Sequence, residues 1–228
     1  MPEKVGVVGL GLMGSVLASK LIAAGYEVHG CDIDDARVEA LKAGGGIPAS
    51  TPSEAAKEAS FVVLSLLNSD IVKEVCFGQD GIVQSAREGL IVIDTTTARP
   101  EDSIETAEKL RELGVSFLDT SLSGSRDNIV ALAGGDEGAL DKARPVIDTF
   151  ARSCHYMGES GKGARTKLIV NLISGLNRLV MAEGLVFGMK AGMDMESLLE
   201  VLMDTAAYSK AMASRGKRMI DADYENPS

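Results

Sequence analysis

Three glycines near the start of the chain have a spacing that allows the backbone to bind a phosphate. Gly9, Gly11 and Gly14 follow an apolar run and precede a helical pattern, which is the arrangement GxGxxG. In that context the glycines permit a tight turn, the close approach of a pyrophosphate and close packing of helix on strand. The start of the helix then offers N–H groups to the anion. We therefore predict a dinucleotide site that also includes Leu12 and Met13, with a tight turn alone as the alternative.

An acidic residue further along the chain indicates which dinucleotide binds. Asp32 stands 18 residues after Gly14 and directly follows the apolar stretch 27–31. A carboxylate in this position accepts hydrogen bonds from ribose hydroxyls and repels a 2′-phosphate. The pattern therefore favours NAD as the cofactor over NADP. The neighbouring Asp34 and Asp35 add negative charge, and they suit equally well the cap and first turn of the next helix.

Polar residues late in the chain could carry acid–base chemistry. Four of them share one face of a predicted helix, because they are spaced i, i+4, i+7 and i+11: Lys167, Asn171, Ser174 and Arg178. Apolar neighbours and a cofactor cation would disfavour the ammonium form of Lys167, so this lysine could exchange protons nearer neutral pH. The alternatives are a solvated surface lysine and, for Arg178, a surface salt bridge.

These residues require a scaffold of alternating strands and helices. Short apolar runs predict strands at 4–8, 27–31, 61–66, 90–93, 115–118, 129–133 and 154–157. Helical patterns lie between them, at 12–24, 35–43, 53–58, 70–76, 80–87, 100–113 and 138–151. Strands separated by helices indicate βαβ units. We therefore predict an α/β fold with a Rossmann-type, doubly wound and mostly parallel sheet.

The last part of the sequence contains helical patterns and no strand pattern. Helices are predicted at 163–192, 195–206 and 209–221. We therefore predict two domains, a dinucleotide-binding domain at 1–160 and an all-helical domain at 161–228. Because so few helices can barely bury their own apolar faces, we expect the second domain to be incomplete within this sequence. The same apolar faces predict a homo-oligomer.

The composition argues against several other kinds of protein. The chain has 228 residues, a net charge of −10, 45% hydrophobic residues and 25% charged residues, which are ordinary values for a globular protein. It has no basic stripe for nucleic acid, and no uninterrupted apolar run approaches the roughly 20 residues of a membrane span. The N-terminus does not resemble a signal peptide. The cysteines and histidines lack metal-ligand spacings, so we expect a cytoplasmic protein without a metal site.

Five short segments occur in an order that carries a family resemblance. They are "GLGLMGS" at 9–15, "LSLLNS" at 64–69, "DTTTARP" at 94–100, "DTSLSG" at 119–124 and "GKGARTKLIVN" at 161–171. Together they resemble the β-hydroxyacid dehydrogenase family, which includes 3-hydroxyisobutyrate dehydrogenase and tartronate semialdehyde reductase. The resemblance covers nearly the whole chain, from residue 5 to about residue 225.

The resemblance implies a role for each matching position. It implies cofactor contacts for Leu66, Leu67 and Thr97, substrate contacts for Ser123, Gly124 and Asn171, and the acid–base role for Lys167. Ser123 and Gly124 would hold the substrate carboxylate, and Thr97 would lie near the nicotinamide. An ordinary turn serine is the alternative for Ser123. A helix-capping cluster ahead of Pro100 is the alternative for the threonines.

The chain departs from the family pattern in two places. The segment "SGSRDNIVALAGG" has Ser125 where the family usually has glycine, and a shorter loop brings Arg126 and Asp127 near the expected pocket. The family's helical domain also continues beyond the length of this chain and carries a further lysine–aspartate motif near the cofactor. We therefore expect the shape of the pocket to differ from that of the family.

The predicted function is hydride transfer between NAD and a small anionic β-hydroxyacid, or the corresponding semialdehyde, with Lys167 as general acid–base. One alternative is an NADPH-dependent aldehyde or imine reductase of the same fold. Asp32 argues against NADPH, and imine-reducing relatives generally lack a lysine at the position of Lys167. The other alternative is a non-catalytic dinucleotide-binding module, against which Lys167 and Asn171 argue together.

Overall fold

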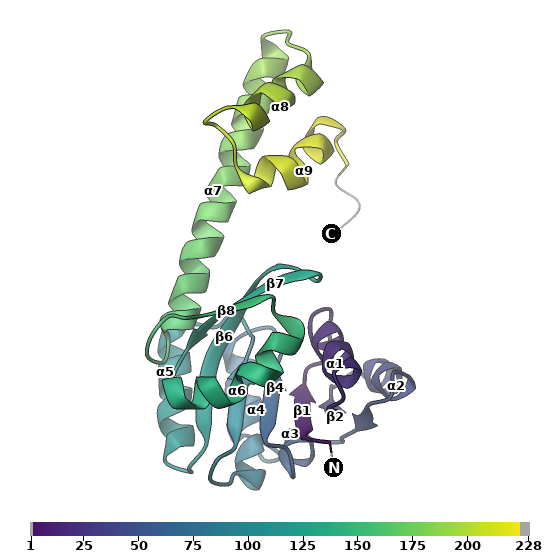
Figure 1. Cartoon of the computed structure of the whole chain (residues 1–228), viewed down its shortest axis with the longest axis vertical. Coiled ribbons are helices and arrows are strands. Elements are labelled where there is room, and N and C mark those ends of the chain that lie inside the picture. The colour runs from purple at the N-terminus through teal and green to yellow at the C-terminus, as the bar shows by residue number, and fades with distance from the viewer. Residues whose placement is uncertain (1, 224–228) are drawn as a thin grey trace. The chain divides into compact units, whose positions relative to one another are not determined.

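Eight strands form one sheet in the computed structural model, which describes residues 2–223 (Figure 1). The strands are β1 Lys4–Val8, β2 Glu27–Cys31, β3 Ile47–Pro48, β4 Phe61–Leu64, β5 Ile91–Asp94, β6 Ser116–Ser125, β7 Asn128–Gly134 and β8 Ser153–Tyr156. Across the sheet their order is β3–β2–β1–β4–β5–β6–β7–β8. All neighbouring strands run parallel except β6 and β7, which are antiparallel. The predicted doubly wound, mostly parallel sheet is therefore confirmed.

Helices cover both faces of this sheet. They are α1 Gly14–Ala23, α2 Asp35–Ala43, α3 Pro52–Ala56, α4 Ser69–Phe77, α5 Pro100–Arg111 and α6 Glu137–Phe150, with a 3-10 helix, η1, at Ile82–Ser85. Buried side chains of α1 and α6 pack against one face, which is turned toward the viewer in Figure 1. Those of α3, α4 and α5 pack against the other face.

The central strands are apolar on both faces because each face is covered. In β1, Val5 and Val7 pack in the cluster with α1 and α6, whereas Val8 packs in the cluster with α3, α4 and α5. In β4, Val63 and Val62 divide between the two clusters in the same way. Continuous apolar runs are typical of parallel strands covered on both sides. This is why short apolar runs predict these strands so closely.

Most predicted boundaries lie within two residues of the observed ones. The strands at 4–8 and 27–31 and the helix at 35–43 have the predicted limits. Two segments differ more, the helix predicted at 80–87 and the strand predicted at 115–118. The two-residue strand β3 carries no recognisable pattern and was not predicted.

The helix predicted at 80–87 is wrong, because only the 3-10 turn η1 forms there. Side chains of this segment attach it to α3 and the loop that follows. Ser85 Oγ donates to the Ser53 carbonyl at 2.9 Å, and Arg87 Nη1 donates to the Ala56 carbonyl at 3.1 Å. Such tertiary contacts outweigh a weak local helical preference.

The strand predicted at 115–118 is longer than expected and ends at Ser125. Its second half is polar, so the apolar pattern in the sequence stops early. The backbone nevertheless continues as a strand, because β6 pairs with the antiparallel β7 as far as Ser125 and Asn128. Gly124 has a φ of +111°, and a Cβ there would overlap the Asn128 carbonyl oxygen. The tight hairpin therefore requires glycine at this position.

The chain divides into two compact units, Met1–Lys167 and Leu168–Ser228, which we term the sheet unit and the helical unit. The division falls inside α7, Lys162–Lys190, so the first turn of this helix and Lys167 belong to the sheet unit. The helical unit also contains α8, Met195–Asp204, and α9, Lys210–Ile220. Among its described residues the buried hydrophobic core is small and consists of Met181, Leu185, Leu199 and Met212.

Helix α7 carries many apolar residues that its own unit leaves exposed. They are Leu168, Ile169, Leu172, Ile173, Leu176, Leu179 and Val180, with Val186, Phe187 and Met189 further along. Small and polar residues interrupt them, so no uninterrupted apolar run has the length of a span. Within the described residues, α7 is nevertheless long and apolar enough to cross a membrane by length and composition alone. Core helices of soluble proteins pass the same test, but those are mostly buried, whereas the apolar window of α7 is 11% buried.

Candidate active site

The glycine-rich loop begins where β1 ends and leads into α1. Gly9 has a φ of +89°, and a Cβ there would overlap the Ser65 carbonyl oxygen just after β4. A Cβ at Gly14 would overlap the Gly9 carbonyl oxygen. The packing of the loop against β4 and against itself therefore requires these two glycines.

Gly11 lies in the same loop, and its surroundings are open. Apart from chain neighbours, the one described heavy atom within 4 Å of a Cβ placed there is Arg37 Nη1, at 3.5 Å. The following Leu12 is 69% exposed. No side chain caps α1 at Met13, and its first turn holds no acidic residue. Open backbone beside an uncapped helix N-terminus fits the close approach of a pyrophosphate.

Asp32 follows β2, and its carboxylate is almost fully buried. One oxygen accepts a hydrogen bond from Leu10 N at 2.6 Å, and the other accepts one from Asp34 N at 3.0 Å. Asp32 therefore fixes the start of the glycine-rich loop to the end of β2. Arg37 lies beside it, with Nη1 3.5 Å from Asp32 Oδ2 and Nε 3.3 Å from Asp34 Oδ2. Arg37 was not among the site residues predicted from the sequence.

The ends of β4 and β5 bring further predicted residues next to this loop. Leu66 Cδ2 lies 3.0 Å from the Cβ position of Gly9, and Leu66 N donates to Thr96 Oγ1 at 3.2 Å. Leu67 is 86% exposed. Thr97 is exposed directly after the buried Thr96. Leu66, Leu67 and Thr97 therefore follow the carboxyl ends of β4 and β5, at the same edge as the glycine-rich loop.

The threonines after β5 do not cap the next helix. The N-cap of α5 is Arg99, which makes no side-chain cap bond. Thr95 Oγ1 donates instead to the Leu64 carbonyl at 2.6 Å. This bond ties the loop after β5 to the end of β4, so the capping alternative does not describe this segment.

The carboxyl half of β6 joins the same network. Ser121 Oγ donates to the Thr96 carbonyl at 3.2 Å. Ser123 is half-buried two residues further along β6, and Gly124 is exposed. A continuous series of contacts thus runs from the glycine-rich loop through Leu66 and Thr96 to β6.

Lys167 ends the sheet unit and reaches back to β6. Its Nζ donates to the Leu122 carbonyl at 2.5 Å, next to Ser123 in the chain. Burial lowers the pKa of Lys167, because removal from water disfavours the charged ammonium. The lysine is therefore held at the polar half of β6 and is not a freely solvated surface residue.

The other three residues predicted on the same helix face, Asn171, Ser174 and Arg178, belong to the helical unit. Asn171 lies one turn after Lys167 in α7 and is exposed. Arg178 Nε donates to the Ser174 carbonyl of its own helix at 3.2 Å. The substrate contacts expected of Asn171, and of Ser123 and Gly124, stay predictions.

Two buried carboxyl groups support the site and were missed from the sequence. Asp94, at the end of β5, accepts a hydrogen bond from Thr96 N at 2.9 Å, and burial raises its pKa to about 7. Asp119, within β6, accepts bonds from Gly161 N and Ala164 N, both at 2.8 Å. Each begins one of the motifs quoted above, and an acidic residue directly after an apolar strand pattern was the available signal.

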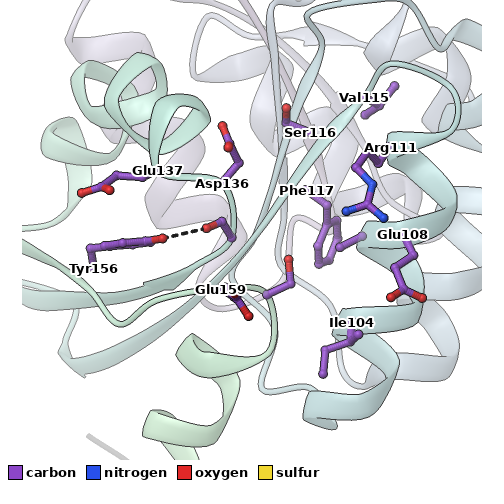
Figure 2. Close-up of a pocket in the computed structure, with 13 residues that line it drawn as sticks. Ile104, Glu108, Arg111, Val115, Ser116, Phe117, Asp136, Glu137, Tyr156 and Glu159 are labelled. Carbon is purple, nitrogen blue, oxygen red and sulfur yellow. Dashed lines mark hydrogen bonds between the residues drawn. The ribbon is translucent and has the colours of Figure 1, made fainter.

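A hollow in the sheet unit lies elsewhere (Figure 2). It has a volume of about 770 Å³ and is lined by residues of α5, the start of β6 and the segments after β7 and β8. Phe117 and Ser116 line it, and six residues of extended strand, about 20 Å, separate Phe117 from Ser123. None of the predicted site residues lines this cavity, so it is not the predicted cofactor site.

The predicted cofactor residues of the sheet unit lie at the point where the strand order reverses. From β1 the chain builds outward through β2 and β3, and then it returns to β4 on the other side of β1. Ligands of doubly wound sheets bind beyond the carboxyl ends of the strands at such a switch point. The glycine-rich loop and Leu66 flank the switch, and the ends of β5 and β6 extend it toward Lys167.

Comparison with known families agrees with this arrangement over almost the whole chain. The family described as the NAD binding domain of 6-phosphogluconate dehydrogenase matches residues 4–158. The family described as NAD-binding of NADP-dependent 3-hydroxyisobutyrate dehydrogenase matches residues 161–228. The first match covers most of the sheet unit, and the second covers the end of the sheet unit and the helical unit.

Individual relatives support the same assignment. The chain is 28% identical to 2-(hydroxymethyl)glutarate dehydrogenase of Eubacterium barkeri, over 95% of this chain and 74% of that protein. It is 30% identical to L-threonate dehydrogenase of Haemophilus influenzae, over 96% and 75%. The structure of Mycobacterium tuberculosis 3-hydroxyisobutyrate dehydrogenase with L-serine superposes with a TM-score of 0.85 and 25% identity, over 100% of this chain and 76% of that one. The chain belongs to the β-hydroxyacid dehydrogenase family of NAD(P)-dependent oxidoreductases.

Proposed function

We propose that the chain oxidises a small β-hydroxyacid with NAD, or reduces the corresponding semialdehyde, and that Lys167 is the general acid–base. The observation that carries this proposal is the bond from Lys167 Nζ to the Leu122 carbonyl. It holds the amine beside Ser123, on a strand whose other contacts lead to the glycine-rich loop. The resemblance to the family assigns the same lysine to catalysis.

The chemistry requires one proton acceptor next to the reacting carbon. When bound, the nicotinamide ring supplies the acceptor or donor of the hydride. In the oxidative direction the neutral amine of Lys167 takes the proton of the substrate hydroxyl. In the reductive direction its ammonium returns that proton to the carbonyl oxygen. Burial favours the neutral amine at lower pH than for a solvated lysine, and Ser123 and Gly124 would hold the substrate carboxylate.

The variant Lys167→Ala tests the acid–base role. We expect turnover to fall by about 10²–10⁴-fold, the usual contribution of a positioned acid–base group, while NAD binding measured by fluorescence titration is retained. Lys162→Ala is the matched control, because Lys162 is an exposed lysine in the first turn of the same helix. Full turnover in Lys167→Ala with normal NAD binding would show that the proposed role is wrong.

We propose NAD as the preferred cofactor over NADP. The support is Asp32, whose carboxylate lies at the end of β2, where the family places the adenine ribose. Arg37, beside Asp32, is a feature that would favour a 2′-phosphate. Its guanidinium, however, is already shared between Asp32 and Asp34, and a phosphate there would meet both carboxylates.

The cofactor preference is tested by kcat/KM with NAD and with NADP. We expect NAD to be preferred, and we expect Arg37→Ala to change the NAD value little. Lys42→Ala is the control, since Lys42 is an exposed residue of the same helix α2. If NADP is preferred and Arg37→Ala removes that preference, Arg37 rather than Asp32 determines the cofactor.

The substrate is proposed as a class, a small anionic β-hydroxyacid or short semialdehyde. The relatives described above are named for 2-(hydroxymethyl)glutarate and L-threonate, which are hydroxyacids of different size. An NAD(H)-coupled screen of 3-hydroxyisobutyrate, glycerate, threonate and short semialdehydes tests the class. Activity with none of them, in a preparation that binds NAD, would contradict it.

We also propose that the chain forms a homo-oligomer in the cytoplasm. The exposed apolar residues of α7 support self-association. The free thiols of Cys31, Cys76 and Cys154 suit a reducing compartment. Light scattering tests the first point, and a monomer at micromolar concentration would contradict it. Cell fractionation tests the second.

A further inference from the structure

Asp119 is a carboxylate that lies inside the sheet unit and makes bonds to the start of α7. It belongs to β6 and is 2% exposed. Its Oδ1 accepts from Gly161 N and its Oδ2 accepts from Ala164 N, each at 2.8 Å. Both carboxylate oxygens therefore bind backbone N–H groups at the beginning of the helix that carries Lys167.

The backbone around these bonds is packed too closely for side chains. A Cβ at Gly163 would overlap the Asp119 carbonyl oxygen, and a Cβ at Gly134 would lie 2.7 Å from Asp119 Oδ1. Gly161 has a φ of +86°, a conformation that other residues rarely adopt. The glycines of the segment "GKG" thus let the first turn of α7 lie directly on β6 and β7.

Burial of Asp119 disfavours its ionised form, whereas backbone hydrogen bonds to its carboxylate favour that form. Burial raises its pKa, and the hydrogen bonds from Ala164 N and Gly161 N oppose that rise. Asp119 also interacts electrostatically with another buried carboxyl group, that of Asp94. Because an anion at a helix N-terminus is stabilised by the free N–H groups and the helix dipole, the ionised form suits this position.

We propose that Asp119 is a positioning residue for catalysis, which holds the first turn of α7 on β6 and thereby sets the place of the Lys167 amine. The inference rests on the proposed function of Lys167. Ala164 and Lys167 are three residues apart, about one helical turn, so a shift of the helix start moves the lysine with it. The bond from Lys167 Nζ to the Leu122 carbonyl attaches the same part of α7 to β6 a second time. Asp119 and Leu122, which are three residues apart on β6, therefore hold about one turn of α7 in place.

The variant Asp119→Asn tests the proposal, because asparagine keeps the shape but cannot accept bonds at both positions. We expect kcat to fall by about 100-fold, the effect of a displacement near 1 Å. Without its anchor the lysine gains water, so its pKa rises. In hydroxyacid oxidation the neutral amine is required, so the rate increases with pH through that pKa. We therefore expect the midpoint of the kcat/KM–pH profile to move upward by about one unit.

A double-mutant cycle separates positioning from stability. If Asp119 acts through Lys167, Asp119→Asn has no further effect on kcat in the Lys167→Ala background. If it only stabilises the fold, it lowers the yield of active enzyme by the same factor in both backgrounds and leaves the pH midpoint unchanged. Asp94→Asn is the matched control, since Asp94 is a buried carboxyl of the neighbouring strand that bonds Thr96 and not α7. Its effect should add to that of Lys167→Ala.

A second variant tests the same bond from the other partner. Ala164→Pro removes the N–H that donates to Asp119 Oδ2, and proline is tolerated in the first turn of a helix. If Asp119→Asn does not fold, Ala164→Pro takes its place in the test. It should show the same lower kcat and the same upward shift of the midpoint of the kcat/KM–pH profile. An additive cycle or an unmoved midpoint in a folded variant overturns the proposal. Full turnover in Lys167→Ala instead contradicts the function of Lys167 itself, so the two failures are distinguishable.

Discussion

The sheet unit and the helical unit differ in how much of their apolar surface they bury. In the sheet unit, large buried clusters lie on both faces of the sheet, and residues such as Leu21 and Val92 are completely buried. In the helical unit the buried core contains four residues among those described, and the first half of α7 exposes apolar side chains such as Leu172. The first unit contains its own core, whereas the second leaves much apolar surface uncovered.

The contrast extends to how each unit holds its polar residues. The site residues of the sheet unit are fixed by bonds to backbone groups, such as Asp32 to Leu10 N and Lys167 to the Leu122 carbonyl. In the helical unit, Asn171 is exposed on the surface of α7. The side chains predicted to form the cofactor site are therefore fixed by bonds within the sheet unit alone.

The largest expected effect compares the two cores. Leu21→Ala in α1 removes a fully buried side chain, and we expect a loss in unfolding free energy near the upper end of the range of about 2–5 kcal/mol. Leu199→Ala in α8 should lie near the lower end, because the smaller core around Leu199 can collapse into the space. Urea unfolding followed by circular dichroism measures both. Equal losses would remove the energetic contrast between the units.

The next effect concerns the buried carboxyl of Asp94 in the sheet unit. Its pKa is about 7 in the native state against an ordinary value of 3.8, because burial disfavours the charge. The native state therefore binds more protons than the unfolded state between about pH 4 and 7, and its stability should fall as pH rises through this window. The expected slope is at most about 1.4 kcal/mol per pH unit.

The variant Asp94→Asn isolates this contribution. Asparagine does not titrate and still accepts the bond from Thr96 N. Relative to the native protein, the variant should become progressively more stable from pH 4 to 7, as measured by urea unfolding at each pH. A stability difference that stays constant across the window would mean that Asp94 is ionised throughout.

A smaller effect distinguishes the glycines of the loop. Gly11→Ala adds a Cβ in open space, so the unfolding free energy should change little, while NAD affinity should fall by about tenfold because the pyrophosphate must lie close to this backbone. Gly14→Ala places a Cβ on the Gly9 carbonyl oxygen and should lower stability as well. Calorimetric titration with NAD and thermal unfolding measure the pair. Unchanged NAD affinity in Gly11→Ala would show that the pyrophosphate does not bind against this loop.

The sequence predicts the sheet unit well because its signals are local. Strands covered on both faces are continuous apolar runs, and the glycine-rich loop is a contiguous motif. The contacts that the sequence does not reveal join distant segments. Asp119 and Gly161 are 42 residues apart, and no local pattern indicates that a buried acid of one strand binds the start of a later helix.

Contacts between distant segments also account for the predictions that were wrong. The segment 80–87 has helical periodicity, but Ser85 and Arg87 bond to residues about 30 positions earlier. The polar second half of β6 was not predicted as a strand because it lacks an apolar pattern. Pairing with β7 maintains the strand there. Arg37 was not predicted as a site residue, although the turn that begins α2 brings it next to Asp32.

The smallest expected effect on folding belongs to the exposed face of α7, and it tests the contrast most directly. Leu172 is 62% exposed and Leu113, in the sheet unit, is 48% exposed. Because neither side chain is part of a core, Leu172→Lys and Leu113→Lys should each change the unfolding free energy of the monomer by less than about 0.5 kcal/mol. Only Leu172→Lys should weaken self-association, since a charge on a buried contact surface is costly. Sedimentation across a concentration series measures this. If both variants associate as the native chain does, the apolar face of α7 is not the surface through which copies meet.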